Sequence, residues 1–344
     1  MISPKKLLIV RTDRIGDVVL SLPMAELVKR KYPDCIVEYF VRKYTSSLLE
    51  NNPFIDDVVI AIEENNKLHF NENLLLIKSK GFDTCIVVNP TFMISLMMFF
   101  ARITNRIGTG YRWYSFLFNI KVFEHRKYAE RHELEYNLNL LKKLGIDDGD
   151  LSTKINFNLY VKIENTETIN RMLKEKRIDL NHKIVIVHPG SGGSSVDLPK
   201  EKLIELTKSL SSLENVSVII TGNKNEAVLC KEFEVNKSII NFAGELDLPM
   251  LKALINKADL FISNSTGPMH IAAALGVYVI GFFPNILSCS QKRWGPYTDK
   301  MTIFSPTIDC NNCTRQQCEK IDCMNSIDIG RVFDETKSVL KNLN

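Results

Sequence analysis

The chain contains 344 residues, which is too many for one compact core and suits two domains of ordinary size. Hydrophobic residues make up 45% and charged residues 24%, a balance that excludes a disordered chain. The net charge of +4 is too small to indicate nucleic-acid binding. It is compatible with anionic substrates or an anionic membrane surface, and equally with ordinary scatter around neutrality.

The first apolar segment is too short for a secretion signal, because Leu7–Val10 is followed at once by Arg11 and Asp13. The longest apolar stretch, Phe92–Phe100, falls well short of the ~20 residues that span a bilayer. We therefore expect a cytoplasmic protein, whose cysteines stay reduced.

Short β-branched runs alternate with helical patterns in the first half of the chain. The predicted strands cover residues 7–10, 36–41, 58–62 and 85–88, and the predicted helices cover residues 18–31, 45–50, 71–80 and 91–103. Such alternation predicts a parallel sheet that helices cover on both faces. In the last of these helices, apolar residues 92, 93, 96, 97 and 100 recur at helical spacing, which predicts core burial rather than membrane contact.

The pattern restarts after a polar join at residues 162–181. Further strands are predicted at 184–187, 216–221, 238–241, 260–263 and 278–282, with helices at 200–213, 225–233, 249–257 and 268–275. We expect an N-terminal domain of residues 1–165, a C-terminal domain of residues 166–325, and a final segment 326–344 whose helix folds back across the cleft. Ligands of open α/β sheets bind at the carboxyl ends of the strands.

The segment Arg11–Val18 joins the first predicted strand to the first helix and contains Gly16 and Asp17. It lacks the G-x-G-x-x-G pattern, so a nicotinamide oxidoreductase is poorly supported. Asp17 has two interpretations: it caps the helix N-terminus, or it is a general base where ligands bind. Capping is the commoner role of a carboxylate in a turn.

Residues 8–20, which read LIVRTDRIGDVVL, together with Leu22-Pro23 resemble the opening of glycosyltransferase family nine, the ADP-heptose:lipopolysaccharide heptosyltransferases. The resemblance covers nearly the whole chain. It implies a GT-B-type α/β fold, with two Rossmann-like domains whose parallel sheets face a central cleft. It also implies that the aspartate after the glycine, Asp17 in this chain, is the catalytic base.

A glycine-rich turn, His188–Ser194, follows the predicted strand at 184–187, and its N–H groups and hydroxyls suit phosphate oxygens. A similar segment faces the nucleotide diphosphate in the family. Relatives often carry Lys or Arg and a Trp a few residues later, whereas this chain reads Ser195-Val196-Asp197-Leu198-Pro199. The candidate replacements for that cation are Lys200, Lys224 and Arg14. The donor-binding residues that the resemblance implies in this turn are His188, Gly190, Ser191 and Gly192.

Two later segments complete the predicted donor site. Glu226 is either a charge in the first turn of a helix or, by resemblance, the carboxylate that binds the ribose hydroxyls. The run Ile262–Gly276 resembles the family's nucleotide-sugar signature, and a helix that opens at Gly267-Pro268 suits a diphosphate. His270 is otherwise a packing histidine, and relatives often have Asp in place of Ser265. The donor-binding residues implied here are Ser265, Thr266, Gly267 and His270.

Two further segments, Arg106–Gly108 and His132–Leu138, lie late in the first half of the chain. In the family, similar segments precede and begin the helix that lies nearest the acceptor. A basic cluster around Arg112, Arg126 and Arg131 suits a carboxylated or phosphorylated acceptor, although solvated surface charge is the default interpretation. The candidate acceptor-binding residues are Arg14, Arg112 and His132.

Four of the eight cysteines lie close together, at Cys310, Cys313, Cys318 and Cys323. Four thiolates can close a tetrahedral zinc site, and clusters in cytosolic proteins indicate metal more than disulfides. The resemblance implies that relatives carry a similar cluster without an obligatory metal. On the spacing of its thiolates, the cluster is a candidate structural zinc site, and no catalytic role is expected for it.

Together with these features, the family resemblance implies an inverting glycosyltransferase that needs no catalytic cofactor. It would move a heptose from ADP-heptose to a lipid-linked saccharide of the lipopolysaccharide core at the inner membrane surface, without any nucleic-acid partner. Three alternatives stay open: a transferase of the same fold with another nucleotide sugar or a protein acceptor, a non-catalytic nucleotide-sugar-binding member, and the poorly supported oxidoreductase.

Overall fold

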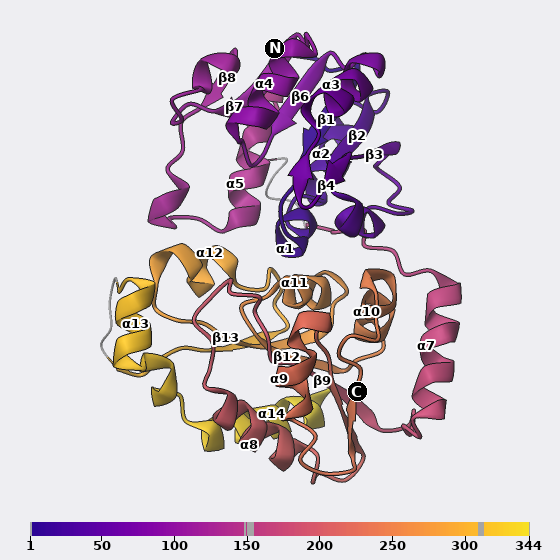
Figure 1. Ribbon diagram of the computed structural model, residues 1–344, viewed down its shortest axis with the longest axis vertical. Coiled ribbons are helices and arrows are strands. Elements are labelled where there is room, and N and C mark those ends of the chain that lie inside the picture. Colours follow the sequence, from indigo (N-terminus) through magenta and orange to yellow (C-terminus); the bar gives the residue numbers. More distant parts are fainter. Residues whose placement is uncertain (1, 148, 150–154, 309–312, 344) are drawn as a thin grey trace. The chain divides into compact units, whose positions relative to one another are not determined.

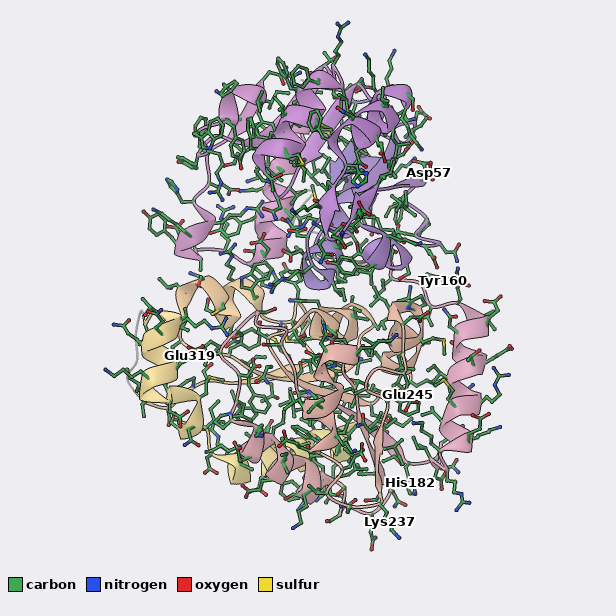
Figure 2. All side chains as sticks on the ribbon, viewed as in Figure 1. Asp57, Tyr160, His182, Lys237, Glu245 and Glu319 are labelled. Atoms are coloured by element: carbon green, nitrogen blue, oxygen red, sulfur yellow. The ribbon has the colours of Figure 1, made fainter. Side chains whose placement is uncertain are left out.

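The computed structural model describes residues 2–147, 149, 155–308 and 313–343 (Figure 1). It contains two compact units, one of residues 1–126 with 131–160 and one of residues 127–130 with 161–344. Tyr160, labelled in Figure 2, is the last residue of the first unit. Each unit has its own six-stranded sheet, so the predicted α/β class with parallel sheets is confirmed.

The first unit is built on a parallel sheet in the order β3-β2-β1-β6-β7-β8. Its strands are β1 (Lys6–Val10), β2 (Ile36–Val41), β3 (Asp57–Ile60), β6 (Thr84–Val87), β7 (Asn105–Thr109) and β8 (Ile120–Val122), and a small antiparallel hairpin joins β4 (Glu63–Glu64) to β5 (Lys67–Leu68). Its helices are α1 (Ile15–Val19), α2 (Pro23–Lys31), α3 (Phe70–Ser79), α4 (Phe92–Phe100) and α5 (Glu133–Asn139), with 3₁₀ turns η1 (Lys43–Leu48), η2 (Ser115–Leu117) and η4 (Leu140–Leu144). The central strand β1 is apolar and buried from Leu7 to Val10, as expected for a strand that is covered on both faces.

The second unit repeats the architecture with a parallel sheet in the order β11-β10-β9-β12-β13-β14. Its strands are β9 (Lys183–His188), β10 (Val216–Ile220), β11 (Ile239–Asn241), β12 (Leu260–Asn264), β13 (Tyr278–Phe282) and β14 (Met301–Phe304). Its helices are α7 (Ile163–Glu175), α8 (Lys200–Leu210), α9 (Ala227–Lys231), α10 (Leu248–Ile255), α11 (Gly267–Ala274), α12 (Gln291–Trp294), α13 (Arg315–Ile321) and α14 (Ile329–Asn342), and its 3₁₀ turns include η5 (Lys224–Glu226), η6 (Leu287–Cys289) and η7 (Cys323–Ser326). The short turn η3 (Arg126–Tyr128) lies where the chain changes unit.

The first helical segment differs from the prediction. One helix was expected over residues 18–31, but the chain forms α1 and then α2, which begins at Pro23. Proline has no N–H and is favoured at the first helical position, so it starts a second helix instead of continuing the first. The helix expected at residues 45–50 is the 3₁₀ turn η1.

Core burial was predicted for residues 92, 93, 96, 97 and 100 of α4, but only Met97 of these is buried and Leu96 is half-buried. Ile94, Met97 and Met98 belong to the core, but the opposite face of the helix is open. The exposed side chains on that face are Phe92, Met93, Phe99 and Phe100. A helix that packs only one side against a sheet leaves the other side to solvent or to a partner.

The final helix, α14, packs against α8 inside the second unit. Its side chains Val332, Val339 and Leu340 are buried in the same core as Leu203 and Leu206 of α8. Among the described residues, none of the helices has both the length and the apolar character that crossing a bilayer requires.

Candidate active site

Asp17 lies just beyond the carboxyl end of β1, in the first turn of α1. The N-cap of this helix is Arg14, whose side chain makes no capping hydrogen bond, so the interpretation of Asp17 as an N-cap is wrong. A carboxylate in the first turn is still favoured by the helix dipole. The turn therefore places Asp17 where parallel sheets bind their ligands, with a role that capping does not explain.

A buried arginine, Arg11, holds the Asp17 carboxylate. The Arg11 side chain is 1% exposed, and its Nη2 lies 2.5 Å from Asp17 Oδ1. Its Nε lies 3.0 Å from Asp13 Oδ1, and Nη2 is 3.7 Å from Glu133 Oε1 at the start of α5. Glu133 also pairs with Arg126. Three carboxylates thus surround one buried guanidinium, and the second arginine offsets part of the remaining negative charge.

Burial raises the pKa of Asp17 to about 6; the Arg11 guanidinium opposes that rise, while Asp13 and Glu133 add to it. The Asp17 side chain keeps 17% of its surface exposed, so a substrate can reach it. A carboxylate with a pKa near the working pH is ionised at neutral pH and basic enough to take a proton from a hydroxyl. This combination makes Asp17 a candidate general base.

Two of the three candidate acceptor residues lie on elements next to Asp17. Arg14 is exposed and directly precedes α1. His132 is the N-cap of α5: its Nδ1 accepts from the Leu134 N–H at 3.1 Å, and its own N–H donates to Glu135 at 3.0 Å. The side chain of Asn137 in α5 donates to the Leu20 carbonyl at 3.0 Å, which ties this helix to the end of α1.

The third candidate acceptor residue, Arg112, belongs to a different part of the first unit. It lies in the connection between β7 and η2, where its N–H donates to Ser115 Oγ at 2.9 Å and its side chain is exposed. The acceptor role of all three residues stays a prediction.

The second unit brings several predicted donor residues together at the carboxyl ends of β9 and β10. His188 Nδ1 lies 2.9 Å from Thr221 Oγ1, and its Nε2 lies 3.9 Å from Glu226 Oε2. Burial lowers the pKa of His188, although Glu226 opposes this, and so favours the neutral imidazole. Glu226 accepts from the Asn223 N–H at 2.9 Å and closes a capping box at η5.

The glycine-rich turn packs tightly against the Glu226 carboxylate. A Cβ on residue 190 would lie 2.1 Å from Glu226 Oε1, so any larger residue there would displace the Glu226 carboxylate. Gly192 and Gly193 have φ of +57° and +73°, a conformation that other residues adopt at a cost. The turn therefore presents its backbone, without side chains in the way, beside the carboxylate.

Asn264 fastens this turn to the end of β12. Its side chain is 1% exposed, accepts from the Leu198 N–H at 2.8 Å and donates to the Pro189 carbonyl at 2.8 Å. The next residues, Ser265 and Thr266, are also buried, and α11 begins at Gly267-Pro268. α11 thus starts three residues after Asn264, which binds the chain on both sides of the glycine-rich segment, and the N–H groups at its N-terminus suit an anion.

Arg315, which the sequence analysis did not select, supplies a cation to the same turn. It is the first residue of α13, and its Nη1 donates to the Gly193 carbonyl at 3.0 Å. Beside it lies a pocket of about 560 Å³, whose lining includes Ser194, Ser195, Ser288 and Thr314. Hydroxyls together with a guanidinium suit sugar hydroxyls and phosphate oxygens.

The predicted replacements for the family's cation are placed less favourably. Lys200 is exposed and pairs with Glu232 at 2.7 Å. Lys224 is exposed at the start of η5, two residues before Glu226, and Arg14 belongs to the first unit. Arg315, by contrast, donates to the Gly193 carbonyl of the glycine-rich turn, while its Nε pairs with Glu319 at 2.8 Å.

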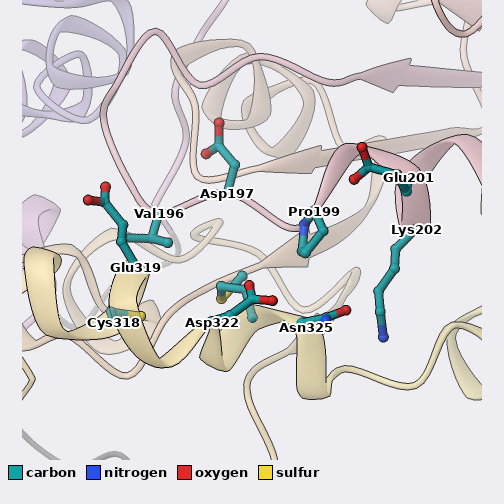
Figure 3. A pocket seen from close by; sticks show the side chains of 10 residues that line it. Val196, Asp197, Pro199, Glu201, Lys202, Cys318, Glu319, Asp322 and Asn325 are labelled. Carbon is teal, nitrogen blue, oxygen red and sulfur yellow. The ribbon is translucent and has the colours of Figure 1, made fainter.

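A second pocket of about 560 Å³ lies between the start of α8 and the segment α13–η7 (Figure 3). Four carboxylates line it against one amine, that of Lys202. The carboxylates belong to Asp197, Glu201, Glu319 and Asp322. An acidic lining repels a nucleotide diphosphate, so this pocket does not suit the donor.

The model of glycosyltransferase family 9 (heptosyltransferase) matches residues 76–323, which is more than half of the chain. The protein belongs to glycosyltransferase family 9. A Haemophilus influenzae protein provisionally named a glycosyltransferase is 29% identical over 88% of this chain and 89% of its own length. Lipopolysaccharide heptosyltransferase 1 of Campylobacter coli is 24% identical over 98% of this chain and 93% of its own length.

The fold of this family 9 enzyme is similar to that of a solved Escherichia coli structure, ADP-heptose lps heptosyltransferase II. The two chains are 20% identical with a TM-score of 0.79, over 97% of this chain and 98% of the other. At that identity the likeness establishes the fold, which is of the GT-B type. The predicted family, fold type and glycosyltransferase activity are thus confirmed.

The cysteine cluster is only partly described in the family 9 structure. Cys310 lies outside the described residues; Cys318 and Cys323 are buried, and Cys313 is half-buried. Cys323 Sγ lies 3.5 Å from the Cys318 carbonyl. Within the described ranges, no group of three or more potential ligands is arranged to hold a metal ion. The structural zinc site stays a prediction.

Arg11, Glu133 and Arg315 are parts of the site that the sequence did not predict. Arg11 offered one signal, because an arginine at the end of a buried strand needs a carboxylate partner. Glu133 offered none, since it is over a hundred residues from Arg11 in sequence. Arg315 lies in a segment whose four cysteines drew the interpretation toward metal binding.

Proposed function

We propose that this family 9 enzyme transfers a heptose from ADP-heptose to a lipid-linked saccharide of the lipopolysaccharide core. The observation that carries the proposal is the Asp17 carboxylate, which is held by Arg11 at 2.5 Å with a pKa raised to about 6 by burial. The family match and the name of the E. coli structure support the donor and the pathway. Because this acceptor is lipid-linked, we propose that the transfer takes place at the inner face of the cytoplasmic membrane.

The proposed reaction is a single displacement with inversion. Asp17 takes the proton of the acceptor hydroxyl while that oxygen forms a bond to the anomeric carbon. The bond from the anomeric carbon to the ADP phosphate oxygen breaks, ADP leaves with the bonding electrons, and the proton stays on Asp17. General-base catalysis of this kind contributes roughly 10²–10⁴-fold.

The departing diphosphate gains negative charge, and the second unit offers three groups that can stabilise it. These are the backbone N–H groups of the Gly190–Gly193 turn, the N-terminus of α11, and the Arg315 guanidinium. Glu226 and His188, beside the turn, are proposed to meet the ribose and the phosphates. Because fixed dipoles and a guanidinium can neutralise the leaving group, we propose that catalysis needs no metal cofactor.

A second candidate function is a transferase of the same fold with another nucleotide sugar or a protein acceptor. Ser265 favours it, because relatives often have Asp at this position and the donor sugar lies nearby in the proposal. A member that binds nucleotide sugar without turnover is the third candidate.

Calorimetric titration of the purified protein with ADP, UDP, GDP and ADP-heptose separates these candidates. Selective binding of ADP and ADP-heptose is expected. Preference for UDP or GDP would keep the fold and overturn the heptose donor. Binding of ADP-heptose without turnover on any core acceptor would favour the non-catalytic candidate.

A further inference from the structure

The outward face of α4 is apolar although it is exposed. Phe92 and Met93 lie seven residues before Phe99 and Phe100, which is two helical turns, so the four side chains share one face. They are between 41% and 49% exposed, and α4 contains no charged residue. A surface helix of a soluble domain normally turns polar residues to water, so this face is suited to a partner.

The neighbouring sheet edge continues this apolar surface. Trp113, Phe116 and Phe123 are 73%, 65% and 63% exposed. Trp113 precedes η2, Phe116 lies within it, and Phe123 directly follows the edge strand β8. The Phe92 and Trp113 rings lie 4.8 Å apart, and the Tyr114 hydroxyl donates to the Pro90 carbonyl at 2.7 Å. Figure 1 shows α4, β7 and β8 close together in the first unit. We name the exposed set the aromatic edge: Phe92, Met93, Phe99, Phe100, Trp113, Phe116 and Phe123.

The charged residues of the segment that carries the aromatic edge are mostly positive. Residues 91–126 contain five Lys and Arg but a single acidic residue, Glu124. Arg102, Arg112 and Lys121 are exposed, and the Arg106 guanidinium lies over the Phe99 ring at 5.3 Å. A second copy of the chain would place these cations opposite each other with hardly any carboxylate between them. A surface of anionic headgroups over an apolar interior matches both the rings and the cations.

We propose that the aromatic edge docks the protein on an anionic lipid bilayer. The aromatic side chains enter the interfacial region, and the flanking cations contact phosphate groups. The inference rests on the proposed function in one respect: docking brings the first unit, which carries Asp17, to the surface where a lipid-linked acceptor is found. The contact is reversible, because it is made by side chains on the surface of one unit.

Trp113 provides a direct reporter of docking. The chain has two tryptophans, so the Trp294→Phe protein contains Trp113 alone. We expect its fluorescence to shift to shorter wavelength with vesicles of phosphatidylcholine and phosphatidylglycerol, and less with phosphatidylcholine alone. Added salt should weaken binding to the anionic vesicles. An unchanged spectrum in every mixture, or self-association in place of vesicle binding, would overturn the proposal.

A pair of double variants tests which surface is responsible. Phe99→Glu with Phe116→Glu should reduce co-sedimentation with anionic vesicles about tenfold or more, since two charges enter the interface. The matched control is Ile163→Glu with Val228→Glu, which adds the same charge at side chains 67% and 81% exposed in the second unit. Equal loss in both proteins, or loss in neither, contradicts docking through the aromatic edge.

Turnover with two forms of the acceptor separates docking from the proposed function. The Phe99→Glu, Phe116→Glu protein should keep its turnover on a delipidated, soluble core saccharide and lose it on the same saccharide in vesicles. Equal turnover of this variant on both forms overturns docking alone. Vesicle binding by the wild-type protein without turnover on either form supports docking and overturns the proposed function.

Discussion

At the scale of single residues, two aspartates of the candidate site pair with the same arginine. Asp13 and Asp17 both lie beside the Arg11 guanidinium, at 3.0 and 2.5 Å, and both side chains are 17% exposed. Burial raises the pKa of Asp17 to about 6, and Asp13 is held at the edge by the Asn89 side chain at 2.9 Å. Asp17 therefore combines a raised pKa with the position that the family resemblance implies for the base.

The Asp17→Asn protein should fold and lose about 10²–10⁴-fold in kcat, because the amide cannot take the acceptor proton. The ordered Arg11 network, which keeps Asp13 and Glu133, explains why the fold should survive. Steady-state kinetics with ADP-heptose measures the loss. Asp13→Asn is the matched control and should lose far less; near-normal turnover of the Asp17→Asn protein would remove this carboxylate from the mechanism.

The pKa of Asp17 also predicts the acid limb of the pH profile. The base acts in its ionised form, so kcat/KM should fall about tenfold per pH unit below about 6 and be level above it. A pH series in buffers of constant ionic strength checks this. An acid limb near pH 4, the ordinary range of an exposed carboxylate, would contradict the raised pKa.

Arg315 should act on donor affinity. Its Nη1 contacts the Gly193 carbonyl, so Arg315→Gln removes the cation nearest the glycine-rich turn and should weaken ADP binding by roughly tenfold. Lys200→Gln is the control, because Lys200 is exposed and pairs with Glu232. Calorimetry with ADP measures both proteins. A larger loss in the Lys200 variant would assign the role of the missing cation to Lys200.

At the scale of elements, the turn after β9 is held by one amide. Asn264→Ala would leave the Leu198 N–H and the Pro189 carbonyl buried without their partner, at a cost of roughly 2 kcal/mol or more in the free energy of unfolding. ADP affinity should fall as well, since the turn loses its anchor. Denaturant unfolding and ADP titration measure the two effects. Asn181→Ala, at an exposed position, should change neither, and unaltered ADP binding by the Asn264 variant would contradict the anchoring role.

Sequence patterns predicted some strands of the two sheets and missed others. The buried strands β1, β9 and β12 were predicted because continuous apolar runs such as Leu7–Val10 mark a strand that is covered on both faces. The strands β7, β8 and β14 were missed, since each is only partly buried and contains polar residues; Asn105–Thr109, for example, mixes polar residues with glycine.

The loop motifs were also predicted, because each is contained in a short stretch of sequence. The contacts between segments that are distant in sequence were not predicted. The Gly190–Glu226 and Asn264–Leu198 contacts depend on which strands become neighbours in the sheet. The exposed face of α4 was also unpredictable, because helical spacing shows that apolar residues share a face without showing whether anything covers it. Periodicity therefore predicted the elements, while the site required the order of the strands.

At the scale of the whole molecule, the chemistry is divided between two units of similar architecture. The candidate base and two of the candidate acceptor residues belong to the first unit, around β1, α1 and α5. The predicted donor residues belong to the second, around β9, η5 and α11. A division of this kind lets donor binding and acceptor activation be measured separately in the intact chain.

Hydrogen exchange with and without ADP should therefore show its largest protection in the second unit, at residues 188–198, 221–227 and 264–274, because these segments carry the proposed phosphate and ribose contacts. Mass spectrometry of peptic fragments provides the resolution. The Asp17→Asn protein should give the same map, since its change removes a base and leaves the donor site intact, whereas Arg315→Gln should weaken protection at 188–198. Protection centred on residues 11–20 would reverse the assignment of the two units, and the first unit would then be the one that binds the nucleotide.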